Sequence, residues 1–231
     1  LPPCIINLQA RESASGKKHP PVLAAKLTDI GGVLSYDPYK LATWRPRHAI
    51  GKHTLLLAHQ ESRDAKQERL FRWLNEDGCF RHLGLLSEFI FVAPGLSVYD
   101  DGTMCPLRQI LNMRLSLRLA ARANRCGVKS VPVFGWNHNR STDIEFLAGW
   151  CSRQGDLLKV IAVNAQTGSL SRELTNLAAG MLEIERLANR EYQWIVFGGR
   201  RRIEYLSEKL PRNRLVQIAR EKDFQIPATG R

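Results

Sequence analysis

Short apolar runs alternate with amphipathic stretches of ten to twenty residues from about His53 onward. The apolar runs are rich in β-branched and aromatic residues, which is typical of strands. They predict strands at Thr54–His59, Phe89–Ala93, Val131–Trp136, Lys159–Asn164, Gln193–Phe197 and Leu215–Ala219. The amphipathic stretches predict helices between them, at Ala65–Leu74, Leu107–Cys126, Asp143–Gln154, Ser171–Asn189 and Ile203–Leu210.

Most of these predicted strands are apolar throughout rather than alternating, which indicates strands that are covered on both faces and therefore parallel. Strands that alternate with helices predict an α/β fold of about six β-α units. Two architectures stay open: a TIM-like barrel, complete or reduced, and an open, mainly parallel sheet. A complete barrel typically needs about 250 residues, so the 231-residue chain favours a reduced one.

Residues 1–50 have a different pattern, because Pro and Gly interrupt them every few residues. Pro2-Pro3, Pro20-Pro21 and Gly31-Gly32 are typical of turns and loops. We therefore predict an irregular N-terminal extension over residues 1–50 and an α/β domain over residues 51–231.

The charge of the chain indicates an anionic partner. Lys and Arg number 34 against 22 acidic residues, a formal net charge of +12, and 24 of the 34 are arginines. Guanidinium groups bind phosphate in a bidentate way and stack on bases, so nucleic acid or a nucleotide is the predicted partner. No apolar run approaches the roughly 20 residues that span a bilayer, which predicts a cytoplasmic protein without a membrane partner. A protein partner or an oligomer stays open.

Cysteine usage predicts a reducing compartment and inert or buried thiols. The five cysteines are widely spaced and odd in number, which disfavours a disulfide framework. No ligand spacing of a structural zinc site is complete, and neither a dinucleotide-binding nor a P-loop motif occurs. We predict no metal and no cofactor.

In parallel α/β folds the ligand binds at the carboxyl ends of the strands. Three polar residues that end or follow predicted strands are the catalytic candidates: Asp101, His138 and Asn164. A carboxylate and an imidazole in one pocket would support acid–base chemistry. The alternative is that the aspartate belongs to a turn and that the histidine is a hydrogen-bonded structural residue.

A glycine-rich loop after the strand Gln193–Phe197 is the predicted anion site. Gly198 and Gly199 would let backbone N–H groups approach a phosphate, and Arg200 and Arg201 add positive charge. The alternative is a tight turn with solvated arginines.

A second basic feature is the predicted helix Leu107–Cys126. Arg114, Arg118, Arg122 and Arg125 fall on one face of it, and the helix has no acidic residue. Like charges at i,i+4 repel unless an anion neutralises them, so the first three of these arginines are candidates for binding phosphate. Trp136 is a candidate for stacking on a base, with core packing as the alternative.

These residues give the chain a resemblance to the domain-of-unknown-function family 4417, whose members occur in phages, plasmids and other mobile elements. It is carried by Phe91–Tyr99, Pro106, the helix with Gln109, Ile110, Asn112 and Arg114, and Gly127–Val133. The resemblance implies a TIM-like α/β fold and work on nucleic acid. The chain departs from it at Gly95, which stands where the family has an aspartate, so an activity that needs that carboxylate would be lost or relocated.

Three functions are consistent with these observations, and in the third of them the loops carry no chemistry. The first is a nucleic-acid-associated protein that binds phosphates through arginine. The second is a TIM-like enzyme that acts on a nucleotide or another phosphorylated ligand. The third is a partner-binding module. We favour the first, because the charge belongs to the whole chain whereas no catalytic set is complete.

Overall fold

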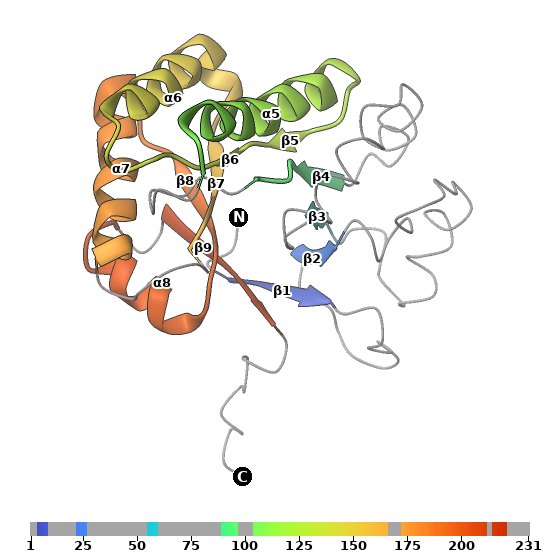
Figure 1. Ribbon diagram of the computed structural model, residues 1–231. Helices are drawn as coiled ribbons and strands as arrows, with labels where there is room; N and C mark the ends of the chain where they lie inside the picture. Colours follow the sequence, from blue (N-terminus) through green and yellow to red (C-terminus); the bar gives the residue numbers. More distant parts are fainter. Residues whose placement is uncertain are drawn as a thin grey trace, which may run out of the picture.

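A computed structural model describes residues 4–8, 22–26, 55–59, 89–96, 104–165, 172–211 and 214–220 (Figure 1). The strands are β1 (Cys4–Leu8), β2 (Val22–Lys26), β3 (Leu55–His59), β4 (Phe89–Val92), β5 (Ser130–Val131), β6 (Val133–Phe134), β7 (Val160–Asn164), β8 (Gln193–Phe197) and β9 (Leu215–Arg220). The helices are α5 (Pro106–Arg125), α6 (Ser141–Gln154), α7 (Arg172–Ala188) and α8 (Arg200–Ser207), with a 3-10 turn at Gly155–Leu157.

The described strands form one sheet in the order β5-β4-β3-β2-β1-β9-β8-β7-β6. Every pairing in it is parallel. The predicted α/β class and the mainly parallel sheet are therefore confirmed. The TIM-like barrel is not confirmed, because no pairing among the described strands joins the two ends of this order, β5 and β6, and closes the sheet.

Pro132 divides the predicted strand Val131–Trp136 into β5 and β6. Proline has no N–H to donate to a neighbouring strand, yet its carbonyl accepts a hydrogen bond from the Ala162 N–H at 2.9 Å. On the other side, the Val131 carbonyl accepts from the Ala93 N–H at 2.9 Å. The segment thus changes its pairing partner at the proline, from β4 to β7.

The prediction of irregular structure over residues 1–50 is wrong for two segments, β1 and β2. β1 pairs with both β2 and β9, and β2 pairs with β3, so backbone pairing crosses the predicted boundary at residue 50. Both strands are only five residues long and follow closely after proline pairs. Pairing with neighbouring strands, which no local pattern encodes, determines their structure.

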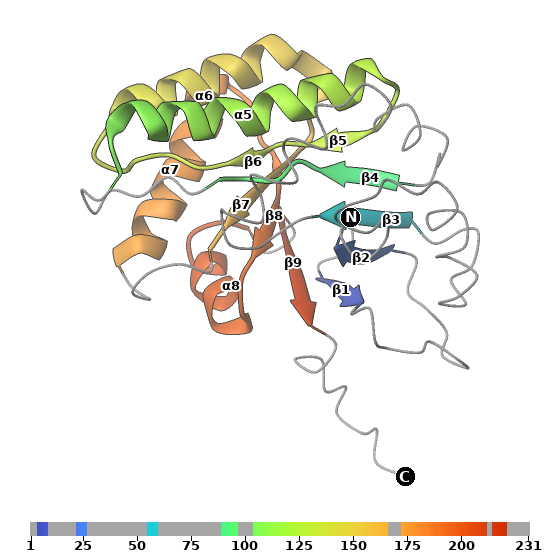
Figure 2. The same cartoon turned by 45° about the vertical axis from the view of Figure 1, so that its right-hand side comes forward.

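The two faces of the sheet are both apolar. Along β8, Trp194 and Val196 pack with the helices, whereas Ile195 and Phe197 belong to a second buried cluster with Val216. Successive residues of a strand point to opposite faces, so a strand covered on both sides is apolar throughout. In Figure 2, α5 and α6 lie side by side over β5 and β6, and α7 and α8 flank β7 and β8.

Because the strands are parallel neighbours, the loops that follow them leave from one edge of the sheet. The segments after β4, β6, β7 and β8 lead into α5, α6, α7 and α8 from this edge. None of the described helices combines the length and apolarity that crossing a membrane requires. The predicted helix Ala65–Leu74 lies outside the described residues.

Candidate nucleic-acid interface

Helix α5 has sharp ends that its sequence explains. Pro106 is at the first helical position, where its missing N–H costs nothing. Gly127 adopts φ +79°, a left-handed conformation that glycine favours, and its N–H donates to the Asn124 carbonyl at 3.0 Å. The Val128 N–H reaches the Ala123 carbonyl at 3.0 Å and completes the end of the helix.

The outward side of α5 presents the arginine stripe, by which we mean Arg114, Arg118, Arg122 and Arg125. Arg114, Arg118 and Arg125 are exposed and Arg122 is half-buried, whereas residues such as Met113 and Leu117 face the core. The predicted common face is therefore observed. Binding of phosphate by these arginines stays a prediction.

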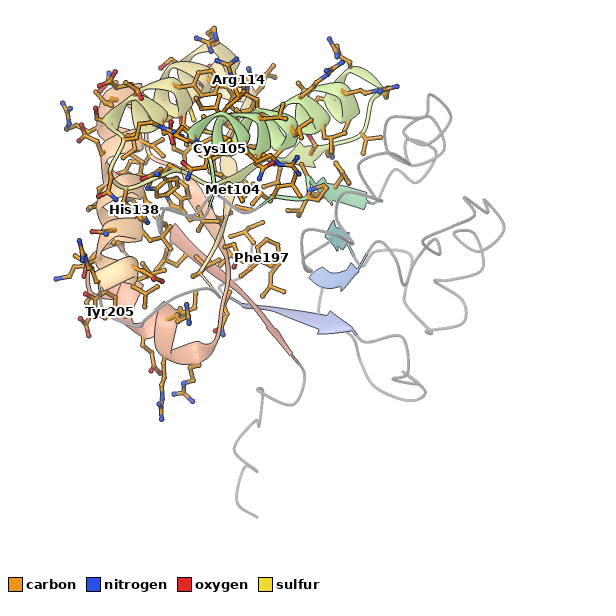
Figure 3. All side chains as sticks on the ribbon, in the orientation of Figure 1. Met104, Cys105, Arg114, His138, Phe197 and Tyr205 are labelled. Atoms are coloured by element: carbon orange, nitrogen blue, oxygen red, sulfur yellow. The ribbon has the colours of Figure 1, made fainter. Side chains whose placement is uncertain are left out.

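Within the part of the chain that the structure describes, the arginines of this stripe have few acidic partners. No ion pair there involves Arg114, Arg118 or Arg125, and α5 has no acidic residue. Figure 3 shows Arg114 on α5. Its guanidinium carbon lies over the ring of Phe146 on α6, 5.2 Å from the ring centre. This cation–π contact holds one cation of the stripe against the neighbouring helix.

Two exposed leucines extend the same face toward the start of α5. Leu107 is 75% exposed and Leu111 is 48% exposed. With the four arginines of the stripe they follow a spacing of three or four residues, which places side chains on one side of a helix. The sequence analysis missed them as functional candidates, although this spacing was visible in the sequence.

The loop after β8 contains the two predicted anion-binding glycines, and they differ in their surroundings. A Cβ on Gly198 would lie 3.3 Å from the Cβ of Ala165, so close packing favours glycine there. A Cβ on Gly199 would meet nothing within 4 Å, and its φ of −70° suits any residue. Gly199 directly precedes α8, whose first N–H groups have no acceptor inside the helix. No atom fills the position of a Cβ on Gly199, so that position is open to a ligand.

The three arginines after Gly199 have different partners. Arg200 pairs with Glu204 at 2.8 Å on the exposed side of α8, and Arg201 is exposed. Arg202 turns back toward the sheet and donates to the Ala165 carbonyl after β7. From the sequence, Arg202 belongs to the same predicted anion-binding loop as Arg200 and Arg201, because three consecutive arginines do not reveal which of them contacts the end of a strand.

The loop after β6 is held by side-chain hydrogen bonds. Asn137 donates from Nδ2 to Gln109 Oε1 at 3.0 Å, and its backbone N–H donates to Asp143 Oδ2 at 3.1 Å. Arg140 donates to both oxygens of Asp143 at 2.6 Å, and this hydrogen bonding raises the pKa of Arg140. These bonds join α5, the loop and α6, so this polar cluster has a structural role.

Trp136 lies in the core rather than at a binding surface. It is 4% exposed, and a Cβ on Gly180 of α7 would lie 2.5 Å from atoms of its indole. A buried ring offers no face to a base, so the predicted stacking role is wrong. Its Nε1–H donates to His138 Nδ1 at 3.1 Å, which gives that histidine a structural partner.

The catalytic candidates are placed only in part. Asn164 is the exposed last residue of β7, beside Phe197 in register, and His138 follows the neighbouring strand β6. Asp101 lies outside the described residues, so no acid–base set is assembled in the described ranges. Those ranges also contain no group of three or more His, Cys, Asp or Glu side chains that could hold a metal ion.

The cysteines of the described part are in contrasting positions. Cys105 and Cys126, at the two ends of α5, are exposed, whereas Cys151 is buried. The prediction of buried or inert thiols is therefore confirmed by burial for Cys151 and stays a prediction for the other two. Their separation by the whole of a 20-residue helix prevents them from forming a disulfide with one another.

Gly95 fills a position where a side chain does not fit. A Cβ there would lie 2.5 Å from Cγ1 of Val133, a buried residue of β6. An aspartate at this position would therefore require the Val133 side chain to move. The packing of this chain is consistent with the absence of the carboxylate that the resemblance would place here.

No family model matches the chain, and no curated protein and no solved structure matches it either. The resemblance to the domain-of-unknown-function family 4417 thus stays an expectation.

Proposed function

We propose that the protein binds nucleic acid and that the arginine stripe of α5 neutralises the phosphates. The observation that supports this most is a helix face with several exposed arginines on a helix without any acidic residue. Like charges at i,i+4 destabilise a helix. A polyanion laid along α5 would remove that repulsion and gain charge-assisted hydrogen bonds.

The charge of the whole chain supports the same partner. A net charge of +12 draws an anionic polymer toward the surface from a distance. The stripe would then supply the short-range contacts, because guanidinium forks match phosphate geometry better than ammonium groups do. A role in a phage, plasmid or other mobile element rests on the family resemblance alone.

The test is a fluorescence anisotropy titration with a labelled oligonucleotide over a series of salt concentrations. Binding should weaken steeply with salt, because each neutralised phosphate releases counterions. Arg118→Gln with Arg125→Gln should weaken binding and flatten the salt dependence. Arg172→Gln with Arg186→Gln is the matched control, since it also removes two charges, from exposed arginines of α7.

Two results would count against this proposal. The first is no measurable binding at low salt, which favours the partner-binding module. The second is equal loss of affinity in the double variant and in the control, which would mean that the net charge acts without a specific surface.

We also infer a TIM-like barrel as the architecture. It is supported by the parallel strands and by β5 and β6, which stand at opposite ends of the strand order but are separated along the chain by Pro132 alone. The inner buried cluster of Val92, Val131, Ala162, Ile195 and Val216 draws on strands from both ends of that order. Such a cluster is what the interior of a barrel requires.

A TIM-like enzyme that acts on a nucleotide or another phosphorylated ligand is the second candidate function. The open space at Gly199, directly before α8 and beside the carboxyl ends of β7 and β8, favours it. Backbone N–H groups at such a position bind phosphate in many α/β proteins. Gly199→Val should then weaken nucleotide binding in calorimetric titration without unfolding the protein, and unchanged affinity would contradict this second candidate.

A further inference from the structure

We infer that the nucleic acid is single-stranded, with its backbone along the arginine stripe and its bases against Leu107 and Leu111; this rests on the proposed function. The two leucines continue the line of the arginines toward the start of α5. At 1.5 Å per residue the distance from Leu107 to Arg125 is about 27 Å. The surface is therefore cationic over most of its length and apolar at one end.

The apolar end of this surface, at the start of α5, needs a ligand that offers apolar groups in addition to negative charge. The two exposed leucines of the helix are Leu107, which is 75% exposed, and Leu111, which is 48% exposed. Leucine is among the apolar side chains that pack against the faces of bases once these are unstacked, and unstacking a step of a duplex costs a few kcal/mol. A single strand offers such faces, whereas a duplex hides them between stacked pairs.

The shape of the surface also disfavours a duplex. A major groove about 12 Å wide admits one α-helix, which is itself about 10–12 Å across. Helix α5 has α6 beside it in both views (Figure 1 and Figure 2), and Arg114 is in contact with Phe146 of that neighbour. Two helices side by side are wider than the groove, so this arrangement disfavours insertion of α5 along the major groove of a duplex.

If charge alone determined binding, the protein would prefer the duplex to the single strand. The inference can therefore be tested by comparing the two. The salt dependence per phosphate is steeper for duplex DNA than for a single strand, about −0.9 against −0.7, because its charge density is higher. A purely electrostatic stripe would therefore bind the duplex at least as tightly. A preference for the single strand requires contacts with bases.

The experiment compares a 20-nucleotide DNA strand without self-complementarity with the duplex it forms with its complement, under the same salt conditions. The wild type should bind the single strand more tightly. Leu107→Ser with Leu111→Ser should weaken single-strand binding roughly tenfold, leave duplex binding within about twofold, and leave the salt slope unchanged. Leu182→Ser, an exposed leucine on α7, is the matched control and should have no effect.

The outcomes separate this inference from the proposed function. Equal or tighter duplex binding, or an unchanged single-strand affinity in the leucine double variant, would overturn the inference and leave phosphate binding by the stripe intact. Absence of binding to both forms at low salt would overturn both. Circular dichroism of the leucine variant should match that of the wild type, since both side chains lie outside the core.

Discussion

The guanidinium carbon of Arg114 lies 5.2 Å from the centre of the Phe146 ring, so a cation of the arginine stripe is held by the helix beside it. Such a contact at a partly exposed site is worth about 0.5–1 kcal/mol. It limits the positions that the guanidinium can take before a ligand arrives.

Phe146→Leu should therefore weaken nucleic-acid binding about two- to fivefold, by loosening Arg114. The charge of the stripe does not change, so the slope of affinity against salt should stay the same. Anisotropy titrations of the variant and the wild type at several salt concentrations measure both quantities. An unchanged affinity would mean that the contact with Phe146 does not position Arg114 for binding.

A buried ion pair joins the end of α7 to the starts of β8 and β9. Glu185 is 7% exposed; its Oε1 accepts from the Tyr192 N–H at 3.0 Å and from Trp194 Nε1–H at 2.9 Å, and its Oε2 lies 3.0 Å from Arg214 Nη2. Glu185→Ala would leave the largely buried guanidinium with exposed Glu191, 3.2 Å from Nη1, as its remaining carboxylate partner. We therefore expect a loss of about 3 kcal/mol, the lower end of the range for a broken buried pair.

Urea unfolding followed by circular dichroism measures that loss. Glu183→Ala is the control, because Glu183 pairs with Arg186 on the exposed side of the same helix. Its midpoint should match that of the wild type. A midpoint for Glu185→Ala that is equally unchanged would contradict the structural role of the buried pair.

The sequence predicted the helices and strands of the second half of the chain well, because their patterns are local. β8 begins and ends as predicted, and α5 differs from its prediction by one residue at each end. Proline at the start of α5 and glycine after its end define the helix without help from the rest of the fold. β1 and β2 could not be predicted in this way, since pairing with distant strands determines them.

The candidate site was predictable in its charges and less so in its contacts. The common face of the α5 arginines follows from helical spacing alone. The burial of Trp136 depends on how α7 packs against the sheet, and the hydrogen bond from Arg202 to the Ala165 carbonyl depends on how α8 packs against it. No property of the neighbouring residues in the sequence encodes that packing.

Gly180 is expected to tolerate no side chain, because a Cβ there would lie 2.5 Å from the indole of Trp136. Gly180→Ala should lower the free energy of unfolding by about 1–3 kcal/mol through overpacking, although alanine favours a helix. Gly149→Ala, inside α6, is the control, since a Cβ there would meet only the side-chain end of Arg153, at 3.5 Å. Thermal melts of both variants test this, and a wild-type midpoint for Gly180→Ala would show that the indole can move aside.

The thiol of Cys151 should make the protein less stable in alkali. Burial raises its pKa from an ordinary value of 9.0 to about 12, and burial also raises the pKa of Tyr192 beside it. Above pH 9 the unfolded chain releases a proton that the folded chain keeps, so rising pH favours unfolding until the folded thiol ionises as well. Between pH 8 and pH 10 the thiol should account for a loss of about 1 kcal/mol.

Urea midpoints of the wild type and of Cys151→Ala at pH 8 and pH 10 test this prediction. The variant should start less stable, because it leaves a small cavity, and should lose less stability between the two pH values. Equal losses in the two proteins would mean that Cys151 does not contribute to the alkaline instability.

Arginine footprinting tests the role of the α5 stripe most directly. Phenylglyoxal modifies accessible guanidinium groups, and mass spectrometry measures the rate at each arginine with and without a saturating single-stranded oligonucleotide. The account predicts slower modification at Arg114, Arg118 and Arg125 in the complex and an unchanged rate at Arg186. Protection confined to Arg200, Arg201 and Arg202, with the stripe modified as fast as in the free protein, would contradict it and place the phosphates at the loop before α8.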